Sequence, residues 1–175
     1  MKKLFLLGLV VILFASCQQQ EPQEQRYFAE SAETNTLEAG IAAYESGDWD
    51  QWRSHFADTA KIYVNSAESI TIDKRLEDMK GMTSAFASYG FDHDEEYIEM
   101  VLDKEDETWV YYWGQHSGTL AANNKVLSIP VHLAVQFVDG KIVEERVYFD
   151  GTEMNQELGA LAEAAAAAEE AADED

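Results

Sequence analysis

The second half of the chain constrains the fold most, because its side chains follow the pattern of strands joined by very short turns. Four segments rich in Val, Ile, Thr and aromatic residues follow one another: Tyr97–Leu102, Thr108–Leu120, Lys125–Phe137 and Lys141–Asp150. Asn123-Asn124 separates the second segment from the third, and Asp139-Gly140 separates the third from the fourth. An Asp-Gly pair between two apolar segments is a strong signal for a two-residue hairpin turn. The pattern therefore predicts an antiparallel meander.

The segment before the meander has a helical period instead. Leu37, Ile41 and Tyr44 recur on one helix face, with Thr36 as the expected N-cap. A short helix is expected over 49–56, and a short strand pair over 61–65 and 69–72. Asp73 is expected to cap another helix, with apolar residues on one face at Leu76, Met79, Met82, Ala85, Phe86 and Tyr89. Helices followed by a meander predict an α+β domain with helices on one face of a curved sheet.

The N-terminus carries the pattern of an export signal. Lys2 and Lys3 precede an apolar stretch of 12 residues, Leu4–Ala15, which is shorter than the ~20 residues of a membrane span. A buried N-terminal helix is the alternative. The string Leu13-Phe14-Ala15-Ser16-Cys17 resembles the lipobox of bacterial lipoproteins. That resemblance implies removal of residues 1–16, lipidation at Cys17, and anchoring in the bacterial cell envelope, at the outer membrane or facing the periplasm.

Composition divides the rest of the chain into three parts. Residues 17–34 are Gln- and Glu-rich and predict a disordered tether, and residues 35–155 predict the folded domain. Residues 156–175 form an Ala- and Glu-rich tail that is expected to be solvated, with a partner-binding helix as the alternative.

Charge and cysteine content exclude several classes of function. Twelve Lys and Arg against 34 Asp and Glu, in 175 residues, give a formal net charge of −22, which argues against nucleic-acid partners. A single cysteine excludes an internal disulfide and a Cys-cluster zinc site, and the four His lack metal-ligand spacing. We therefore expect no metal and no cofactor.

Several local strings resemble the SnoaL-like branch of the nuclear transport factor 2-like superfamily. They are Gly47-Asp48-Trp49, 56–60, 114–118, 138–144 and Val147-Tyr148-Phe149-Asp150. The resemblance implies a cone-shaped barrel, formed by a curved antiparallel sheet packed against N-terminal helices, with an interior pocket. The superfamily includes isomerases, cyclases, epoxide hydrolases, dehydratases and non-catalytic binding domains, so the fold does not choose the function.

Two-residue turns at both hairpins predict which residues share a face of the sheet. They place His116, Val131 and Tyr148 on one rung, with Tyr112, Leu133, Arg146 and Asp150 on the same, largely apolar face. Glu145 and His132 fall on the opposite, more polar face. The first face is the better pocket candidate, because pockets are mostly apolar with a few convergent polar groups.

The polar residues of that face suggest acid–base chemistry. Asp150 is a candidate general base with a pKa raised by apolar surroundings, His116 a proton or hydrogen-bond donor, and Tyr148 a donor to an oxyanion. The alternative interpretation pairs Asp150 with Arg146 and His116 with Tyr148, without catalysis. Tyr63 and Asn65, with Arg146, resemble the water-holding set of epoxide hydrolases, which implies a place in the pocket.

The leading hypothesis is a lipid-anchored protein that binds a small, largely apolar molecule in the cone. The alternatives are an acid–base enzyme of isomerase, cyclase, lyase or epoxide hydrolase type that uses Asp150 and His116, and a protein-interaction module. The alternating aromatic residues Trp109, Tyr111 and Trp113 are compatible with a homodimer formed through the sheet in each case.

Overall fold

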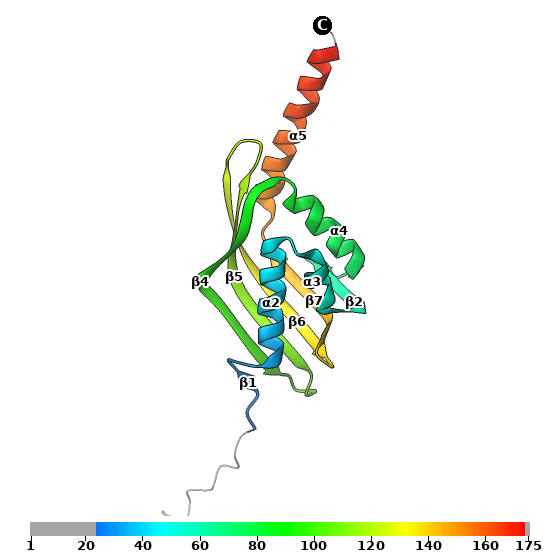
Figure 1. The fold of residues 1–175 in the computed structure, drawn as a ribbon, viewed down its shortest axis with the longest axis vertical. Helices are drawn as coiled ribbons and strands as arrows, with labels where there is room; N and C mark the ends of the chain where they lie inside the picture. The colour runs from blue at the N-terminus through cyan, green and yellow to red at the C-terminus, as the bar shows by residue number, and fades with distance from the viewer. Residues whose placement is uncertain (1–23, 174–175) are drawn as a thin grey trace, which may run out of the picture.

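The computed structural model describes residues 24–173 and shows one sheet with helices on one of its faces (Figure 1). The helices that cover this face are α2 (Ala32–Ser46), α3 (Trp49–Ser54) and α4 (Ile72–Thr83), and α5 (Thr152–Asp173) follows the last strand. The strands are β1 (Tyr27–Phe28), β2 (Phe56–Val64), β3 (Ile70–Thr71), β4 (Phe86–Leu102), β5 (Thr108–Leu120), β6 (Val126–Val138) and β7 (Lys141–Phe149). Their order in the sheet is β1-β4-β5-β6-β7-β2-β3.

The predicted α+β class is confirmed, with a curved sheet that stays open rather than closing into a barrel. Every neighbouring pair is antiparallel except β2 and β7, which are parallel. The main core fills the space between the helices and the sheet. Ile62, Val110, Tyr112 and Val135 are fully enclosed there. No helix within residues 24–173 is long and apolar enough to cross a membrane.

The first helix starts earlier than its apolar spacing predicts. Ser31, rather than Thr36, is the N-cap: its hydroxyl accepts hydrogen bonds from the backbone N–H groups of Glu33 and Thr34, and Thr34 completes a capping box. Tyr27–Phe28 already pairs with β4. The described part of the predicted tether, from residue 24, therefore includes residues that belong to the fold. The expected signal segment 1–16 and Cys17 lie outside the described residues.

The helix predicted to extend to Tyr89 ends at Thr83. Phe86 and Tyr89 instead belong to β4, where they pair with Leu120 and Gly118 of β5. Apolar residues at helical spacing do not exclude a strand, and here the long antiparallel pairing with β5 determines the outcome.

The C-terminal helix packs on the fold through its first turns, which corrects the expectation of a wholly solvated tail. Met154 is buried, and Leu158 and Leu161 pack beside it against a second core cluster that contains Leu120, Leu127 and Ile129. Lys125 pairs with both Glu153 and Glu157, at 2.9 and 2.8 Å. Beyond these turns α5 extends away from the sheet (Figure 1).

One predicted turn is confirmed and the other is longer than expected. Asp139 and Gly140 both have positive φ, 51° and 73°, and Val138 pairs with Lys141, as a two-residue turn requires. Between β5 and β6, Thr119 pairs with Val126, so the connection is longer than Asn123-Asn124 alone. The pairing shifts by two residues, and side chains of β5 and β6 keep their predicted faces.

A bulge in β7 changes the faces of the residues that follow it. Phe137 pairs with Ile142, but the next pair joins Gln136 to Glu144, so Val143 is an extra residue on β7. From Glu144 onward, the pairing with β6 is displaced by one residue from the predicted register. A displacement by one residue moves side chains to the other face of the sheet.

Candidate functional site

A cavity lies between the sheet and the helices that cover it. Its volume is about 110 Å³, counted as the space that the centre of a water molecule can occupy. By that measure one water needs about 10–15 Å³, so the cavity has room for a small organic molecule. Its lining is mainly apolar and comes from helices and strands alike: Leu37, Ile41, Trp52, Phe56, Met79, Met82, Phe91, Ile129, Val131, Leu133, Ile142, Val147, Phe149 and Met154.

The first polar pair in the cavity joins α2 to β5. The hydroxyl of Tyr44 and Nε2 of His116 are 2.9 Å apart, and both residues line the cavity. Burial raises the pKa of the Tyr44 hydroxyl, and nearby Tyr89 raises it further. Burial lowers the pKa of His116, so the imidazole is neutral at pH 7. The sequence predicts His116 on this face but pairs it with Tyr148, whereas the structure gives it Tyr44 as partner.

The second polar pair joins α4 to β7. Arg75 Nε lies 3.6 Å from Glu145 Oε2, with the two side chains 16% and 7% exposed. Neither of these two atoms has a hydrogen-bond partner among the described residues, although both are buried. Burial raises the pKa of the Glu145 carboxyl, while Arg75 acts in the opposite direction. Two residues of the cavity wall therefore carry a buried donor and a buried acceptor that the protein itself leaves unsatisfied.

Sequence reasoning missed this pair. The predicted register placed Glu145 on the polar face opposite the pocket, and the extra residue Val143 brings it into the cavity instead. A bulge at a valine leaves no local signal, because Val is common in regular strands. Arg75 was missed because it is one of several charged residues in a helix that begins beside Asp73.

Tyr148 and Arg146 lie on the outer face of the sheet, contrary to the predicted register. Tyr148 pairs with His132, and their rings stack at 6.4 Å with an interplanar angle of 15°. The Arg146 guanidinium lies over the ring of Tyr63 at 4.3 Å, and its Nε donates a hydrogen bond to Glu144 at 2.7 Å. The bulge at Val143 accounts for both placements, and Tyr63 faces the same side through Arg146.

Asp150 lies just beyond β7, is exposed, and does not line the cavity. Its carboxylate accepts a hydrogen bond from the backbone N–H of Thr152 at 2.9 Å, at the start of α5. Hydrogen bonding to Thr152, through its side chain first and its backbone N–H second, lowers the pKa of Asp150. The expected rise of its pKa in apolar surroundings is therefore wrong. The alternative pairing with Arg146 is also absent among the described contacts, since Arg146 pairs with Glu144.

Of the other predicted pocket residues, some line the cavity and the others make contacts elsewhere in the fold. Val131 and Leu133 line the cavity, but Tyr112 and Asn65 do not. The Asn65 amide group makes two hydrogen bonds to the backbone of Phe149, at 2.8 and 3.0 Å, which join β2 to the end of β7. The Tyr112 ring is enclosed in the core, and its hydroxyl donates a hydrogen bond to Glu96 at 3.1 Å.

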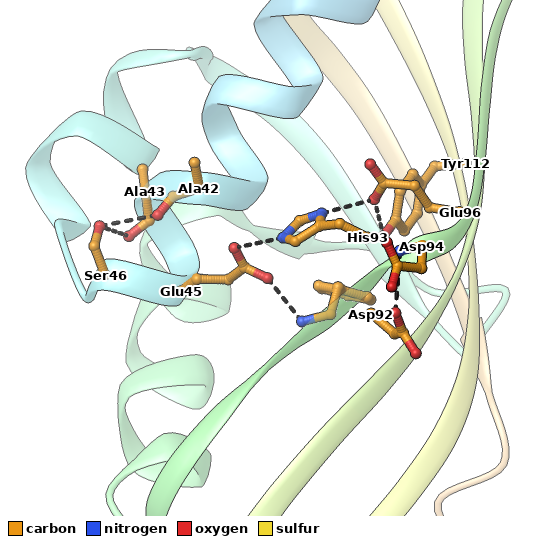
Figure 2. A network of polar contacts seen from close by, with 10 residues as sticks. Ala42, Ala43, Glu45, Ser46, Asp92, His93, Asp94, Glu96 and Tyr112 are labelled. Carbon is orange, nitrogen blue, oxygen red and sulfur yellow. Dashed lines mark hydrogen bonds and ion pairs between the residues drawn. The ribbon is translucent and has the colours of Figure 1, made fainter.

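A carboxylate–histidine network lies where α2 meets β4, outside the cavity (Figure 2). His93 bridges Glu45 and Glu96, with nitrogen–oxygen distances of 3.1 Å on both sides. These two carboxylates raise the pKa of His93. Glu45 also accepts a hydrogen bond from the backbone N–H of Phe91 at 2.7 Å, and Phe91 lines the cavity. The network thus holds β4 against α2. Across residues 24–173, no three His, Cys, Asp or Glu are grouped so as to hold a metal ion.

Comparisons with known proteins agree with this architecture. The family model of SnoaL-like polyketide cyclases matches residues 34–158. AclR from Streptomyces galilaeus, described as a candidate hydroxylase, is 16% identical, with a TM-score of 0.58 over 73% of this chain and 96% of that one. IdmH from Streptomyces antibioticus, described as a candidate polyketide cyclase, is 17% identical, with a TM-score of 0.58 over 73% and 98% of the two chains.

A third structure, a candidate SnoaL-like polyketide cyclase from Shewanella denitrificans, is 12% identical, with a TM-score of 0.57 over 75% of this chain and 99% of that one. At these identities the likeness establishes the fold and leaves the reaction open. A search of curated proteins found no match to the chain.

Proposed function

The chain belongs to the SnoaL-like polyketide cyclase family, and from that premise we propose that it binds a small, largely apolar molecule in the cavity between helices and sheet. One observation carries the proposal: the cavity is lined mainly by apolar side chains, with two pairs of polar groups, Tyr44–His116 and Arg75–Glu145. Apolar lining with a few fixed polar groups is typical of small-molecule sites.

Binding of 2-methoxynaphthalene, followed by fluorescence, tests this proposal. We expect saturable binding that is lost in Leu133→Trp, because the larger side chain fills the cavity. Val138→Trp is the matched control, since Val138 lies on the same strand but is exposed. Circular dichroism checks that both variants fold, and Val131→Phe replaces Leu133→Trp if the latter does not. Absence of saturable binding, or binding unaffected by the filled cavity, contradicts the proposal.

An acid–base enzyme is the second candidate, with Glu145 in the place that the sequence assigned to Asp150. The observation that favours it is a buried carboxyl with a raised pKa inside the cavity, near Arg75. Because two solved relatives are described as candidate polyketide cyclases, an enolisable cyclic ketone is a suitable probe. A base would remove an α-proton from the ketone and return a solvent deuteron to the same carbon.

Exchange of the α-protons of 2-tetralone in D₂O, followed by NMR, separates the two carboxyl groups. We expect Glu145→Gln to slow the protein-dependent exchange by about 100-fold, since a positioned general base contributes roughly 10²–10⁴-fold. Asp150→Asn is the control and is expected to leave the rate unchanged. Exchange no faster than in buffer would remove the enzyme candidate and leave the binding proposal intact.

We also propose that the protein is a lipid-anchored lipoprotein of a bacterial envelope. Support comes from the basic and apolar N-terminal segment and from the position of the single cysteine, Cys17. Metabolic labelling with an alkyne fatty acid in a bacterial host tests it: the wild-type chain is expected to carry label in the membrane fraction. Cys17→Ser is expected to carry none, and equal labelling of both chains would contradict the proposal.

A homodimer through the outer face of the sheet is the assembly that we propose. Trp113 and Tyr148 are 41% and 45% exposed there, and the His132 ring stacks between them. Light scattering during size-exclusion chromatography is expected to give twice the chain mass for the wild type. Trp113→Ser combined with Tyr148→Ser is expected to give the single-chain mass. A monomeric wild type would contradict the proposed dimer, and a different protein would then be the candidate partner for this face.

A further inference from the structure

Among the residues that line the cavity, Arg75 and Glu145 each have a fully buried side-chain atom without a hydrogen-bond partner in the described part of the chain. Tyr44 and His116 already hydrogen-bond each other. Arg75 Nε and Glu145 Oε2 are buried and lack a hydrogen-bond partner among the described residues. A buried polar atom without a partner costs about 1–3 kcal/mol. Since both atoms belong to residues that line the cavity, a ligand that reaches them would remove this cost.

The geometry of the two atoms selects one kind of ligand group. They are 3.6 Å apart and enclosed by protein atoms, so a ligand oxygen reaches them only when the side chains that cover them move. It can then lie about 2.9 Å from both, which is a normal hydrogen-bond length. That oxygen must accept from the Arg75 N–H and also donate to an ionised Glu145. A hydroxyl does both, because it has one O–H donor and two lone pairs. It also suits a protonated Glu145, from which it can accept. An ether or carboxylate oxygen has no proton to donate.

The remainder of the cavity determines the body of the molecule. Met79 and Met82 follow Arg75 along α4, and Ile142 and Val147 flank Glu145 on β7; all four line the cavity and are apolar. Methionine adapts its shape to irregular apolar ligands at little cost. The hydroxyl would therefore be the polar point of an otherwise apolar molecule.

We propose that Arg75 Nε and Glu145 Oε2 form the recognition point for a hydroxyl group, and that the ligand is an apolar alcohol, phenol or enol. This inference rests on the proposed function, because it assumes that the cavity binds an apolar molecule. Arg75 and Glu145 then determine which of several apolar molecules of similar size binds most tightly.

The test compares 2-naphthol with 2-methoxynaphthalene at pH 7.5, since the two probes share a ring system and an oxygen but only the naphthol has an O–H. We expect the wild-type protein to bind 2-naphthol about 10- to 100-fold more tightly, the range for one hydrogen bond to a charged group. In the double variant Arg75→Met/Glu145→Leu the ratio is expected to fall to about one, while 2-methoxynaphthalene still binds. Replacing both partners avoids a lone buried charge and commonly preserves folding.

The matched control is Glu144→Leu/Arg146→Met, which removes an ion pair of the same residue types on the outer face of the same strand. This variant is expected to keep the wild-type ratio. If the double cavity variant fails to unfold cooperatively, Arg75→Met alone is measured, and its ratio is expected to fall several-fold. Equal affinity of the wild type for both probes, or a preference that survives the cavity substitutions, would overturn the inference and leave the binding proposal standing. Failure of both probes to bind would overturn the two together.

Discussion

Two neighbouring glutamates on β7 pair with arginines on opposite faces of the sheet, and the two pairs differ in almost every respect. On the outer face, Glu144 and Arg146 are 2.7 Å apart and hydrogen-bonded, and the guanidinium also lies over the Tyr63 ring. On the cavity face, Glu145 and Arg75 are 3.6 Å apart and not hydrogen-bonded. In the outer pair, whose side chains are partly exposed, the two facing atoms are hydrogen-bonded. In the inner pair, the two facing atoms lie in the wall of the cavity without a hydrogen bond.

The difference between the two pairs indicates that the inner pair is there for ligand binding rather than for the stability of the fold. An exposed ion pair contributes little, about 0–1 kcal/mol, because water screens it. A buried pair is weak evidence for stability as well, because desolvation offsets the attraction between its charges. An inner pair with unsatisfied atoms is therefore poorly explained by stability alone, and its position in an apolar cavity favours a binding role.

The largest effect is expected from removing one glutamate at a time. Glu145→Leu leaves the Arg75 charge buried without a partner, and breaking such a pair costs about 3–5 kcal/mol in the free energy of unfolding. Glu144→Leu, on the outer face, is expected to cost at most about 1 kcal/mol. Urea unfolding followed by fluorescence measures both. Adding Arg75→Met to Glu145→Leu is expected to recover most of the lost stability. Equal losses of unfolding free energy in Glu145→Leu and Glu144→Leu would contradict the difference proposed between the inner and outer pairs.

A smaller effect is expected from two tyrosines that differ in the same way. Tyr44→Phe removes the hydrogen bond to His116 inside the cavity, so a buried imidazole nitrogen loses its partner at a cost of about 1–3 kcal/mol. Tyr148→Phe removes a hydroxyl from the exposed outer face and is expected to change stability by less than about 0.5 kcal/mol. Thermal and urea unfolding of both variants check this. A larger cost for Tyr148→Phe would mean that the outer face is covered, as a dimer interface would be.

Much of the fold was predictable because its signals are local. The Asp139-Gly140 turn depends on two residues that tolerate positive φ, and the structure has both in that conformation. The strands on either side follow from their Val, Ile and aromatic content. The loop at Asn123-Asn124 was predicted too short, yet the pairing shifted by an even number of residues, so His116, Val131 and Leu133 still line the cavity.

The candidate site was less predictable because it depends on one extra residue. Val143 reverses the faces of the β7 residues beyond it, so Glu145 enters the cavity and Tyr148 leaves it. No local pattern distinguishes this valine from one in a regular strand, and only the pairing with β6 reveals the bulge. Asp150 was misplaced for a related reason, since its role as a cap depends on α5, and two residues that hold α5 on the fold, Leu158 and Leu161, lie in the segment expected to be a solvated tail.

The smallest expected effect contrasts two histidines, His116 in the cavity and His93 in the network outside it. Burial lowers the pKa of His116, so the unfolded chain binds this proton more readily, and its contribution to stability is lost as pH falls below about 6.5. Glu45 and Glu96 raise the pKa of His93, so its contribution is complete below about pH 6.5 and is lost as pH rises through the folded-state pKa.

Opposite slopes are therefore expected when each histidine is removed. The stability difference between wild type and His116→Asn is expected to shrink from pH 7.5 to pH 5.5, whereas the difference for His93→Asn is expected to grow over the same interval. Since His93 is largely exposed, its effect is at most about 1 kcal/mol after screening by solvent. Urea unfolding at pH 5.5, 6.5 and 7.5 measures both differences, and raising the salt concentration is expected to weaken only that of His93. If both stability differences changed with pH in the same direction, the opposite pKa shifts expected for His116 and His93 would be contradicted.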